Sequence, residues 1–123
     1  MTQGLRVLVN EFLRRLEAYD FSGALALCTE KAVVWQNDGE GEVAMSDRLD
    51  HFKSFVTNVD SLRYEVTRQV HNGSELFQQH VLRLNLAGGS SDEVHAVVYF
   101  RFEDDHIDRI EEYVYTAPEK NAR

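Results

Sequence analysis

A histidine and a glutamate each interrupt an apolar run that alternates as a β-strand does. His80 is followed by leucines two, four and six residues later, and Glu112 is flanked by Ile110 and Val114. Because residues two apart in a strand share a face, both polar side chains are predicted to point toward the core. A buried carboxylate within hydrogen-bonding distance would orient an imidazole and raise its basicity. We therefore predict that His80 is a proton-transfer residue and Glu112 its partner.

Other side chains on the predicted strands could bind a ligand beside this pair. Gln78 has the same parity as His80, and Asn37 lies two residues after Trp35 on an earlier strand. Amide groups can hold a carbonyl oxygen or a water, and an indole ring can stack on a flat molecule. We therefore predict substrate-binding roles for Trp35, Asn37, Gln78 and Tyr64.

The sequence indicates neither a metal site nor a nucleotide cofactor. The remaining histidines and the single cysteine show no metal-ligand spacing; they are His51, His71, His95, His106 and Cys28. No glycine-rich phosphate loop follows a strand anywhere in the chain. Cys28 lies on a predicted apolar helical face without an adjacent base, so we expect a small buried hydrophobe rather than a nucleophile.

The composition is that of one acidic globular domain. A length of 123 residues is typical of a single domain, so we assign residues 1–123 to one. Hydrophobic residues make up 43% and charged residues 28%, which excludes a disordered chain. The net charge of -8 repels nucleic-acid phosphates and anionic lipids, so we expect neither as a partner. With no signal peptide and no apolar run of about 20 residues, we expect a soluble cytoplasmic protein.

Helical periodicity dominates the first half of the chain. Apolar residues recur at helical spacing over 5–19, which predicts an amphipathic helix. Asp20 is a suitable N-cap for a second, shorter helix whose apolar face extends to Cys28. Ser46 is predicted to cap a third helix that continues to about Val59.

Strand periodicity dominates the second half. Strands are predicted over residues 32–36, 62–70, 76–86, 93–102 and 107–115. Asn72-Gly73 is a strong hairpin signal between the second and third of these strands. Residues 116–123 contain the only proline and are expected to form a frayed tail. The order predicts an α+β fold: a cone-shaped half-barrel in which three N-terminal helices pack on a curved, mainly antiparallel sheet with a pocket on its concave side.

Two stretches carry a resemblance to a known superfamily. They are LEAYDFSGALALCTEKAVVWQND and VVYFRFEDDHIDRIEEYVY. The chain resembles the nuclear transport factor 2-like superfamily, and within it the SnoaL-like group that includes polyketide cyclases. The resemblance implies a cone with a pocket. It leaves the reaction open, because isomerases, cyclases, dehydratases, epoxide hydrolases and non-catalytic binding proteins share that fold.

Two enzyme classes of this superfamily fit the chain poorly. The epoxide hydrolases resemble it at Trp35-Gln36-Asn37 and place their second aspartate at Glu112, but Gln78 and His80 stand where they have an arginine and an aspartate. Ketosteroid isomerases have a tyrosine on the first helix, near Leu13, and a carboxylate at the end of the first strand, where only Asp38 is close. Polyketide cyclases use a lone acid-base residue, with which His80 is compatible.

The outward faces of the last two strands predict a dimer. Apolar and aromatic residues alternate there, namely Val97, Tyr99, Tyr113 and Tyr115. A sheet that is apolar on both faces must be covered on both, and a second copy is the simplest cover. The resemblance also implies a homodimer through the convex sheet face. The alternative is a monomer that tolerates a tyrosine-rich surface.

The sequence thus supports three functional hypotheses. In the first, the pocket binds a small, largely apolar, carbonyl-bearing molecule and catalyses its isomerisation, cyclisation or dehydration without a cofactor. In the second, the same pocket binds or senses a metabolite without turnover. In the third, aromatic rings fill the pocket; these would be Phe52, Phe55, Phe100 and Trp35. The pattern leaves open whether Asp38 or Arg68 reaches the pocket.

Overall fold

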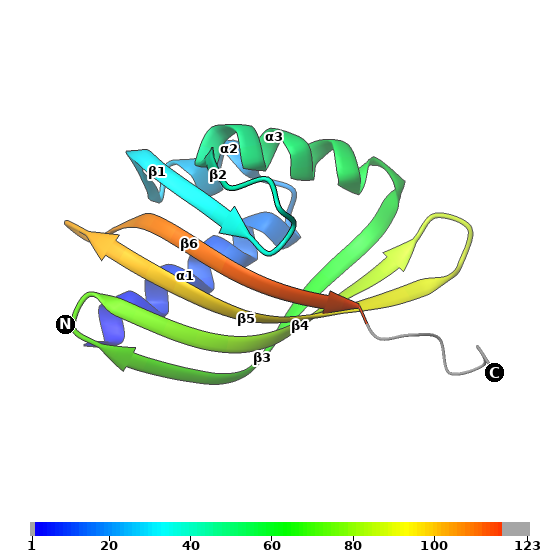
Figure 1. Cartoon of the computed structure of the whole chain (residues 1–123). Helices are drawn as coiled ribbons and strands as arrows, with labels where there is room; N and C mark the ends of the chain where they lie inside the picture. Colours follow the sequence, from blue (N-terminus) through cyan, green and yellow to red (C-terminus); the bar gives the residue numbers. More distant parts are fainter. Residues whose placement is uncertain (1, 117–123) are drawn as a thin grey trace.

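The computed structural model describes residues 2–116, which form three helices packed on a sheet of six strands (Figure 1). The elements are α1 (Thr2–Glu17), α2 (Phe21–Leu25), β1 (Cys28–Gln36), β2 (Glu42–Ala44), α3 (Met45–Phe55), β3 (Val59–Asn72), β4 (Glu75–Leu86), β5 (Ser91–Glu103) and β6 (His106–Thr116). The α+β fold predicted from the sequence is confirmed. The expected tail lies outside the described residues except for Thr116, which ends β6.

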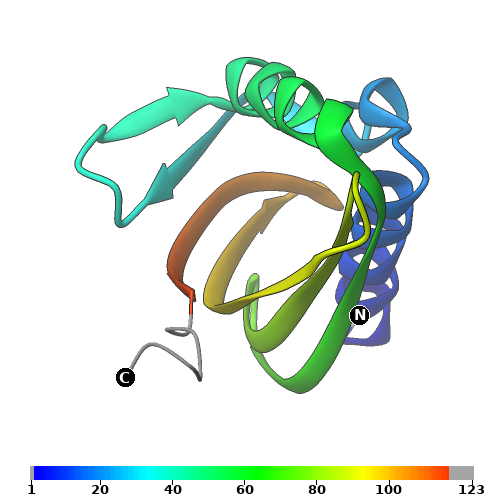
Figure 2. The same ribbon diagram turned by 90° about the vertical axis from the view of Figure 1, so that its right-hand side faces the viewer.

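The strands form one curved, open sheet in the order β2-β1-β6-β5-β4-β3. All neighbouring strands are antiparallel except β1 and β6, which are parallel. The sheet curls around the side on which α1 and α3 lie (Figure 2). The buried core joins helix to sheet there, with Val9, Phe12 and Leu13 of α1 in one cluster with Leu76 and Phe100.

The first two helices form where the periodicity predicts them. Leu13 and Leu16 of α1 are buried, and arginines lie in its last turn, where positive charge is favoured. Asp20 caps α2 as expected: its Oδ1 accepts a hydrogen bond from the Gly23 backbone N–H at 3.0 Å. Arg15 Nη1 donates to Oδ2 of the same carboxylate at 3.0 Å, which ties the two helices together.

The segment between α2 and β3 differs from the sequence prediction. Cys28 lies in β1 rather than on a helix, because the strand starts earlier and pairs in parallel with β6 at Ile107. A short strand, β2, was not predicted; it pairs with β1 through a hairpin over residues 37–41. Helix α3 starts at the buried Met45, so Ser46 is not its cap, and it ends at Phe55 before a 3₁₀ turn (Val56–Asn58).

Three more hairpins connect β3 to β4, β4 to β5 and β5 to β6, in the gaps between the predicted strands. Gly73, between β3 and β4, has a φ of +61°, a conformation that glycine adopts without strain. Between β5 and β6, Asp104 and Asp105 have φ values of +51° and +63°, which aspartate tolerates better than most residues. Within residues 2–116, no helix is both long enough and apolar enough to cross a lipid bilayer.

Candidate functional site

A cavity of about 720 Å³ lies between the concave face of the sheet and α1 and α3. Its walls are mostly apolar; they include Phe12, Leu16, Val34, Met45, Leu49, Phe52, Leu82, Leu84, Ala96 and Ile110. Five polar side chains line its interior, each from a different element: Gln36 of β1, Arg48 of α3, Tyr64 of β3, His80 of β4 and Glu112 of β6. Such an apolar space with a few convergent polar groups is typical of a small-molecule site.

His80 is held in the cavity wall by a chain of two amides. The Gln78 Oε1 atom accepts a hydrogen bond from Gln69 Nε2 at 2.9 Å, so the Gln78 amide nitrogen faces His80 Nδ1, at 2.8 Å. Nδ1 is therefore assigned as the acceptor and the ring proton is placed on Nε2. Burial lowers the pKa of His80 to about 4, so the ring is neutral at pH 7 and its Nε2–H is a hydrogen-bond donor.

Glu112 differs from an ordinary surface carboxylate. It is half-buried, and its Oε1 accepts a hydrogen bond from Gln36 Nε2 at 2.6 Å. Burial raises the pKa of Glu112, while the positive charge of Arg48 and the Gln36 hydrogen bond oppose that rise. A carboxylate whose pKa is raised is a stronger base than an ordinary one, so it can accept a proton and later return it.

Tyr64 completes the polar part of the cavity. Its ring lies edge-on to His80, with centroids 5.1 Å apart and an interplanar angle of 84°. The Glu17 carboxylate accepts a hydrogen bond from its backbone N–H at 2.8 Å, which fixes β3 against α1. Burial and the nearby Glu112 charge raise the pKa of Tyr64, so its hydroxyl stays protonated and can donate a hydrogen bond.

The alternation along the strands predicted that His80 and Glu112 share one cavity, but it predicted the wrong hydrogen-bond partners for them. His80 and Glu112 line one cavity, as predicted from their apolar neighbours. The expected hydrogen bond between them is not found among residues 2–116. Instead, His80 forms a hydrogen bond with the side-chain amide of Gln78, and Glu112 forms one with the side-chain amide of Gln36. Gln78 is 2% exposed and supports His80 from behind rather than lining the cavity.

Two predicted ligand contacts, Trp35 and Asn37, face away from the cavity. The Trp35 ring packs against Tyr113 on the outer face of the sheet, with centroids 5.1 Å apart. The Asn37 side chain extends the sheet: Oδ1 accepts from the Val114 N–H at 3.0 Å, and Nδ2 donates to the Val114 carbonyl at 3.2 Å. The physical reason is the register of β1 and β6, in which Gln36 pairs with Glu112 and so shares its inward face.

The structure also settles the two residues that the pattern left open. Asp38 lies at the rim of the cavity. Arg68 does not reach it, because a bulge between Val66 and Arg68 shifts the parity of β3. The Arg68 guanidinium instead donates to Gln79 Oε1 at 2.9 Å on the outer face.

Cys28 is a buried core residue, as expected from the sequence. Burial raises the pKa of Cys28 to about 12, so its thiol stays protonated. Its Sγ lies 3.6 Å from the Ala24 carbonyl oxygen, inside the core. Within residues 2–116, no three histidine, cysteine or acidic side chains are placed to hold a metal ion.

A substitution can separate the structural role of Asn37 from a role in ligand binding. Asn37→Ala should lower the free energy of unfolding by about 1 kcal/mol, because Val114 loses both side-chain hydrogen bonds. It should leave the affinity of a cavity ligand unchanged. Urea denaturation and ligand titration measure the two effects. Gln36→Ala, at the neighbouring position, is the matched control, and this substitution should change ligand affinity. A loss of affinity in Asn37→Ala would show instead that Asn37 contributes to ligand binding.

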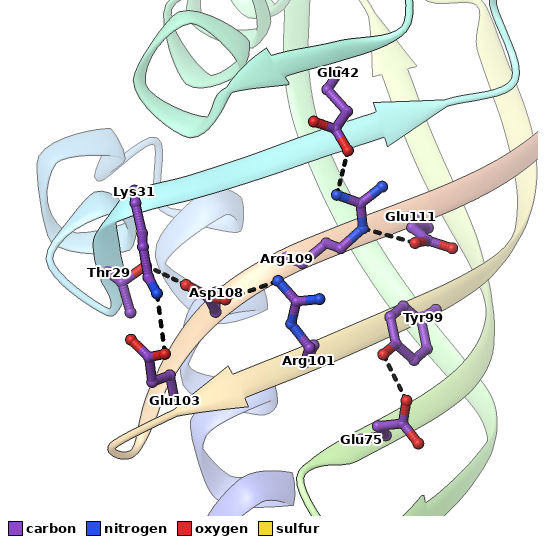
Figure 3. Close-up of polar contacts among 10 residues, drawn as sticks. All are labelled: Thr29, Lys31, Glu42, Glu75, Tyr99, Arg101, Glu103, Asp108, Arg109 and Glu111. Carbon is purple, nitrogen blue, oxygen red and sulfur yellow. Dashed lines mark hydrogen bonds and ion pairs between the residues drawn. The ribbon is translucent and has the colours of Figure 1, made fainter.

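The outer face of the sheet carries an ordered charge layer next to its aromatic residues (Figure 3). Arg109 pairs with Glu42 and Glu111, and Arg101 pairs with the buried Asp108. Other polar contacts in this layer are Thr29 with Asp108, Lys31 with Glu103, and Tyr99 with Glu75. A second cluster at the other end of the sheet joins Arg83 to Glu65 and Glu93.

Exposed apolar and aromatic side chains lie between these charge clusters on the outer face. Val97, Tyr113 and Tyr115 are 46%, 55% and 61% exposed. Phe77 packs against Tyr99 there, with ring centroids 5.1 Å apart. The apolar strip therefore runs diagonally across β4, β5 and β6.

Comparisons with known proteins give one family and many similar folds. The model of the family described as SnoaL-like domain matches residues 9–110. The sequence matches none of the curated proteins. Among solved structures, AclR from Streptomyces galilaeus has a TM-score of 0.85 at 16% identity, over 96% of this chain and 83% of that one.

Two further structures carry the name of an enzyme. An LEH-like epoxide hydrolase of M. tuberculosis has a TM-score of 0.77 at 17% identity, over 93% of this chain and 84% of that one. The BvnE pinacolase of Penicillium brevicompactum has a TM-score of 0.80 at 12% identity, over 91% of this chain and 86% of that one. At these identities the likeness shows the fold alone.

Proposed function

This chain belongs to the SnoaL-like domain family, and we propose that its cavity binds a small, largely apolar carbonyl compound and catalyses proton transfer on it. The reaction class is isomerisation, cyclisation or dehydration through an enol or enolate. Family membership supports a ligand pocket, and the polar groups inside the cavity support the chemistry.

The observation that carries this proposal is the unequal environment of two titratable groups in one cavity. Burial raises the pKa of Glu112 and lowers the pKa of His80 to about 4. A carboxylate whose pKa is raised is a stronger base than an ordinary carboxylate and suits proton abstraction, whereas a neutral imidazole that keeps its Nε2–H suits donation to an oxygen. We therefore assign the proton-transfer role to Glu112, which reverses the roles expected from the sequence.

The remaining polar groups complete a plausible reaction site. A substrate carbonyl oxygen that accepts hydrogen bonds from His80 Nε2–H and the Tyr64 hydroxyl would place its α-carbon in the same cavity as Glu112. Glu112 would take the α-proton, and the two donors would stabilise the negative charge that develops on oxygen. Returning the proton from Glu112 to another carbon gives an isomer, and passing it to a β-hydroxyl, which leaves as water, gives a dehydrated product.

Deuterium exchange tests proton abstraction without knowledge of the natural substrate. 2-Tetralone is an apolar bicyclic ketone whose α-protons can be followed by NMR in D₂O. The protein should accelerate their exchange above the buffer rate. No acceleration with 2-tetralone or other cyclic ketones, together with tight binding of an apolar probe in the cavity, would favour the second hypothesis of a binding or sensing protein.

We also propose that the apolar strip on the outer face is the interface of a homodimer. The strip includes Val97, Tyr99, Tyr113 and Tyr115. Arg83 and Arg109, which flank the strip, are already paired with carboxylates of the same chain, so a second copy can cover the strip without leaving these two charges unpaired. A two-fold axis through the strip would bring the same residues of both copies together.

A charge placed in the strip should separate the two copies. Tyr113→Asp is expected to convert a dimer into a monomer in light scattering at micromolar concentration. Trp35, the single tryptophan, packs on Tyr113, so its fluorescence should shift to the red in the variant. Val7→Asp is the control, since Val7 is an exposed apolar residue on α1, away from the strip. A monomeric wild-type protein would refute the interface.

A further inference from the structure

The rim of the cavity carries carboxylates that other charges do not neutralise. Asp38 and Glu40 belong to the loop between β1 and β2, and Asp47 belongs to the first turn of α3. All three are exposed, and none forms an ion pair with another residue in the 2–116 range. The carboxylates on the outer face differ, because arginine or lysine pairs with most of them there (Figure 3).

The interior of the cavity carries one cation. Arg48 is half-buried and lines the wall from α3, on the same side as Asp47. It lies near enough to Glu112 to lower the pKa of that carboxyl, so part of its field acts on a fixed group of the protein. Inside the cavity the charges of Arg48 and the Glu112 carboxylate offset each other, so the three exposed carboxylates set the sign of the charge that a ligand meets at the entrance.

We propose that this rim selects uncharged ligands and rejects anions such as carboxylates, sulfonates and phosphate-bearing thioesters. The proposal rests on the function proposed above, since it takes the cavity as the ligand site. A negative ligand that enters past Asp38, Glu40 and Asp47 is repelled by these carboxylates and also approaches a molecule of net charge -8. If the ligand is a carbonyl compound, it then arrives as a free neutral molecule and not attached to a phosphate-bearing carrier.

Two fluorescent probes with one skeleton test the charge preference. N-phenyl-1-naphthylamine is neutral, and 8-anilino-1-naphthalenesulfonate adds a sulfonate to the same rings. At low ionic strength the sulfonate should bind on the order of tenfold more weakly than the neutral probe, and the difference should shrink at about 0.5 M salt. The combined variant Asp38→Asn, Glu40→Gln, Asp47→Asn should tighten sulfonate binding and leave the neutral probe unchanged.

The outcomes distinguish failure of the charge preference from failure of the site. Equal or tighter sulfonate binding to the wild-type protein, or no gain in the combined variant, would overturn the preference while the cavity stands. Ala96→Phe puts a ring into the cavity wall and should abolish binding of the neutral probe. Binding that survives Ala96→Phe would show that the probe sits elsewhere, for example on the outer strip, and would overturn the ligand site and the preference together.

Discussion

Glu112→Gln should slow the protein-catalysed exchange of 2-tetralone α-protons by about 10²- to 10⁴-fold, the range expected for loss of a positioned acid-base group. The amide keeps the shape of the carboxylate but cannot accept the α-proton. It can still form a hydrogen bond with the Gln36 side chain, so the cavity should keep its shape. The effect should therefore fall on kcat more than on KM, which initial rates by NMR would measure.

The neighbouring residue supplies a matched control for this substitution. Glu111→Gln makes the same chemical change one position earlier on β6, on the outer face where Glu111 pairs with Arg109. Exchange should proceed at the wild-type rate in that variant. Retained exchange in Glu112→Gln, with the neutral probe still bound in the cavity, would assign the proton transfer to another group and remove the mechanism proposed here.

His80→Gln provides the complementary measurement for the donor role. Its amide can still donate toward the cavity, whereas His80→Leu has no polar hydrogen to offer. If Nε2–H stabilises negative charge on the substrate oxygen, exchange should fall further in His80→Leu than in His80→Gln. If His80 were the base, as predicted from the sequence, both variants would lose activity to the same extent.

The fold was predictable because its main elements are strongly periodic. The helical spacing over 5–19 and the alternation in β3 to β6 depend on which side chains are buried, and the structure buries those faces. Short elements were less predictable. Strand β2 has only the residues Glu42–Ala44 and gains its pairing from β1, which no local pattern of three residues can indicate.

Only part of the candidate site could be predicted from the sequence, because local patterns do not show long-range strand pairing. A polar residue within an alternating apolar strand, such as His80 or Glu112, is visible in the sequence. Strand β1 gave no such signal, because Val33 and Val34 are both apolar and either could face inward. Its inward face follows from the parallel register with β6, which pairs Val34 with Ile110 and Gln36 with Glu112. A long-range pairing thus decided between Gln36 and Trp35 as cavity residues.

The opposite pKa shifts of Glu112 and His80 have one physical cause. Burial disfavours the charged form of any group, so it raises the pKa of a carboxyl and lowers the pKa of an imidazole. Glu112 and His80 share one apolar cavity and are affected in opposite directions. The sequence shows that both are polar residues among apolar ones. The sequence does not show that Glu112 and His80 form no hydrogen bond with each other. That outcome depends on their separate amide partners, Gln36 and Gln78.

His80 should also make the stability of the protein depend on pH. Its pKa is about 4 in the folded protein and about 6.5 in the unfolded chain. Below pH 6.5 the unfolded chain takes up a proton that the folded protein does not accept until about pH 4. The free energy of unfolding should therefore fall by about 3 kcal/mol as the pH drops from 6.5 to 4, as far as His80 determines it.

Glu112 acts in the opposite direction, so the measurement must separate the two groups. Its raised pKa means that the folded protein binds the carboxyl proton more tightly than the unfolded chain, which adds stability as the pH falls. Urea denaturation of the wild-type protein and His80→Gln at several pH values cancels this term, because both proteins contain Glu112. The difference in unfolding free energy between them should change by about 3 kcal/mol between pH 6.5 and 4. A difference that stays constant with pH would mean that His80 is not held neutral, and its assignment as an Nε2–H donor would fail with it.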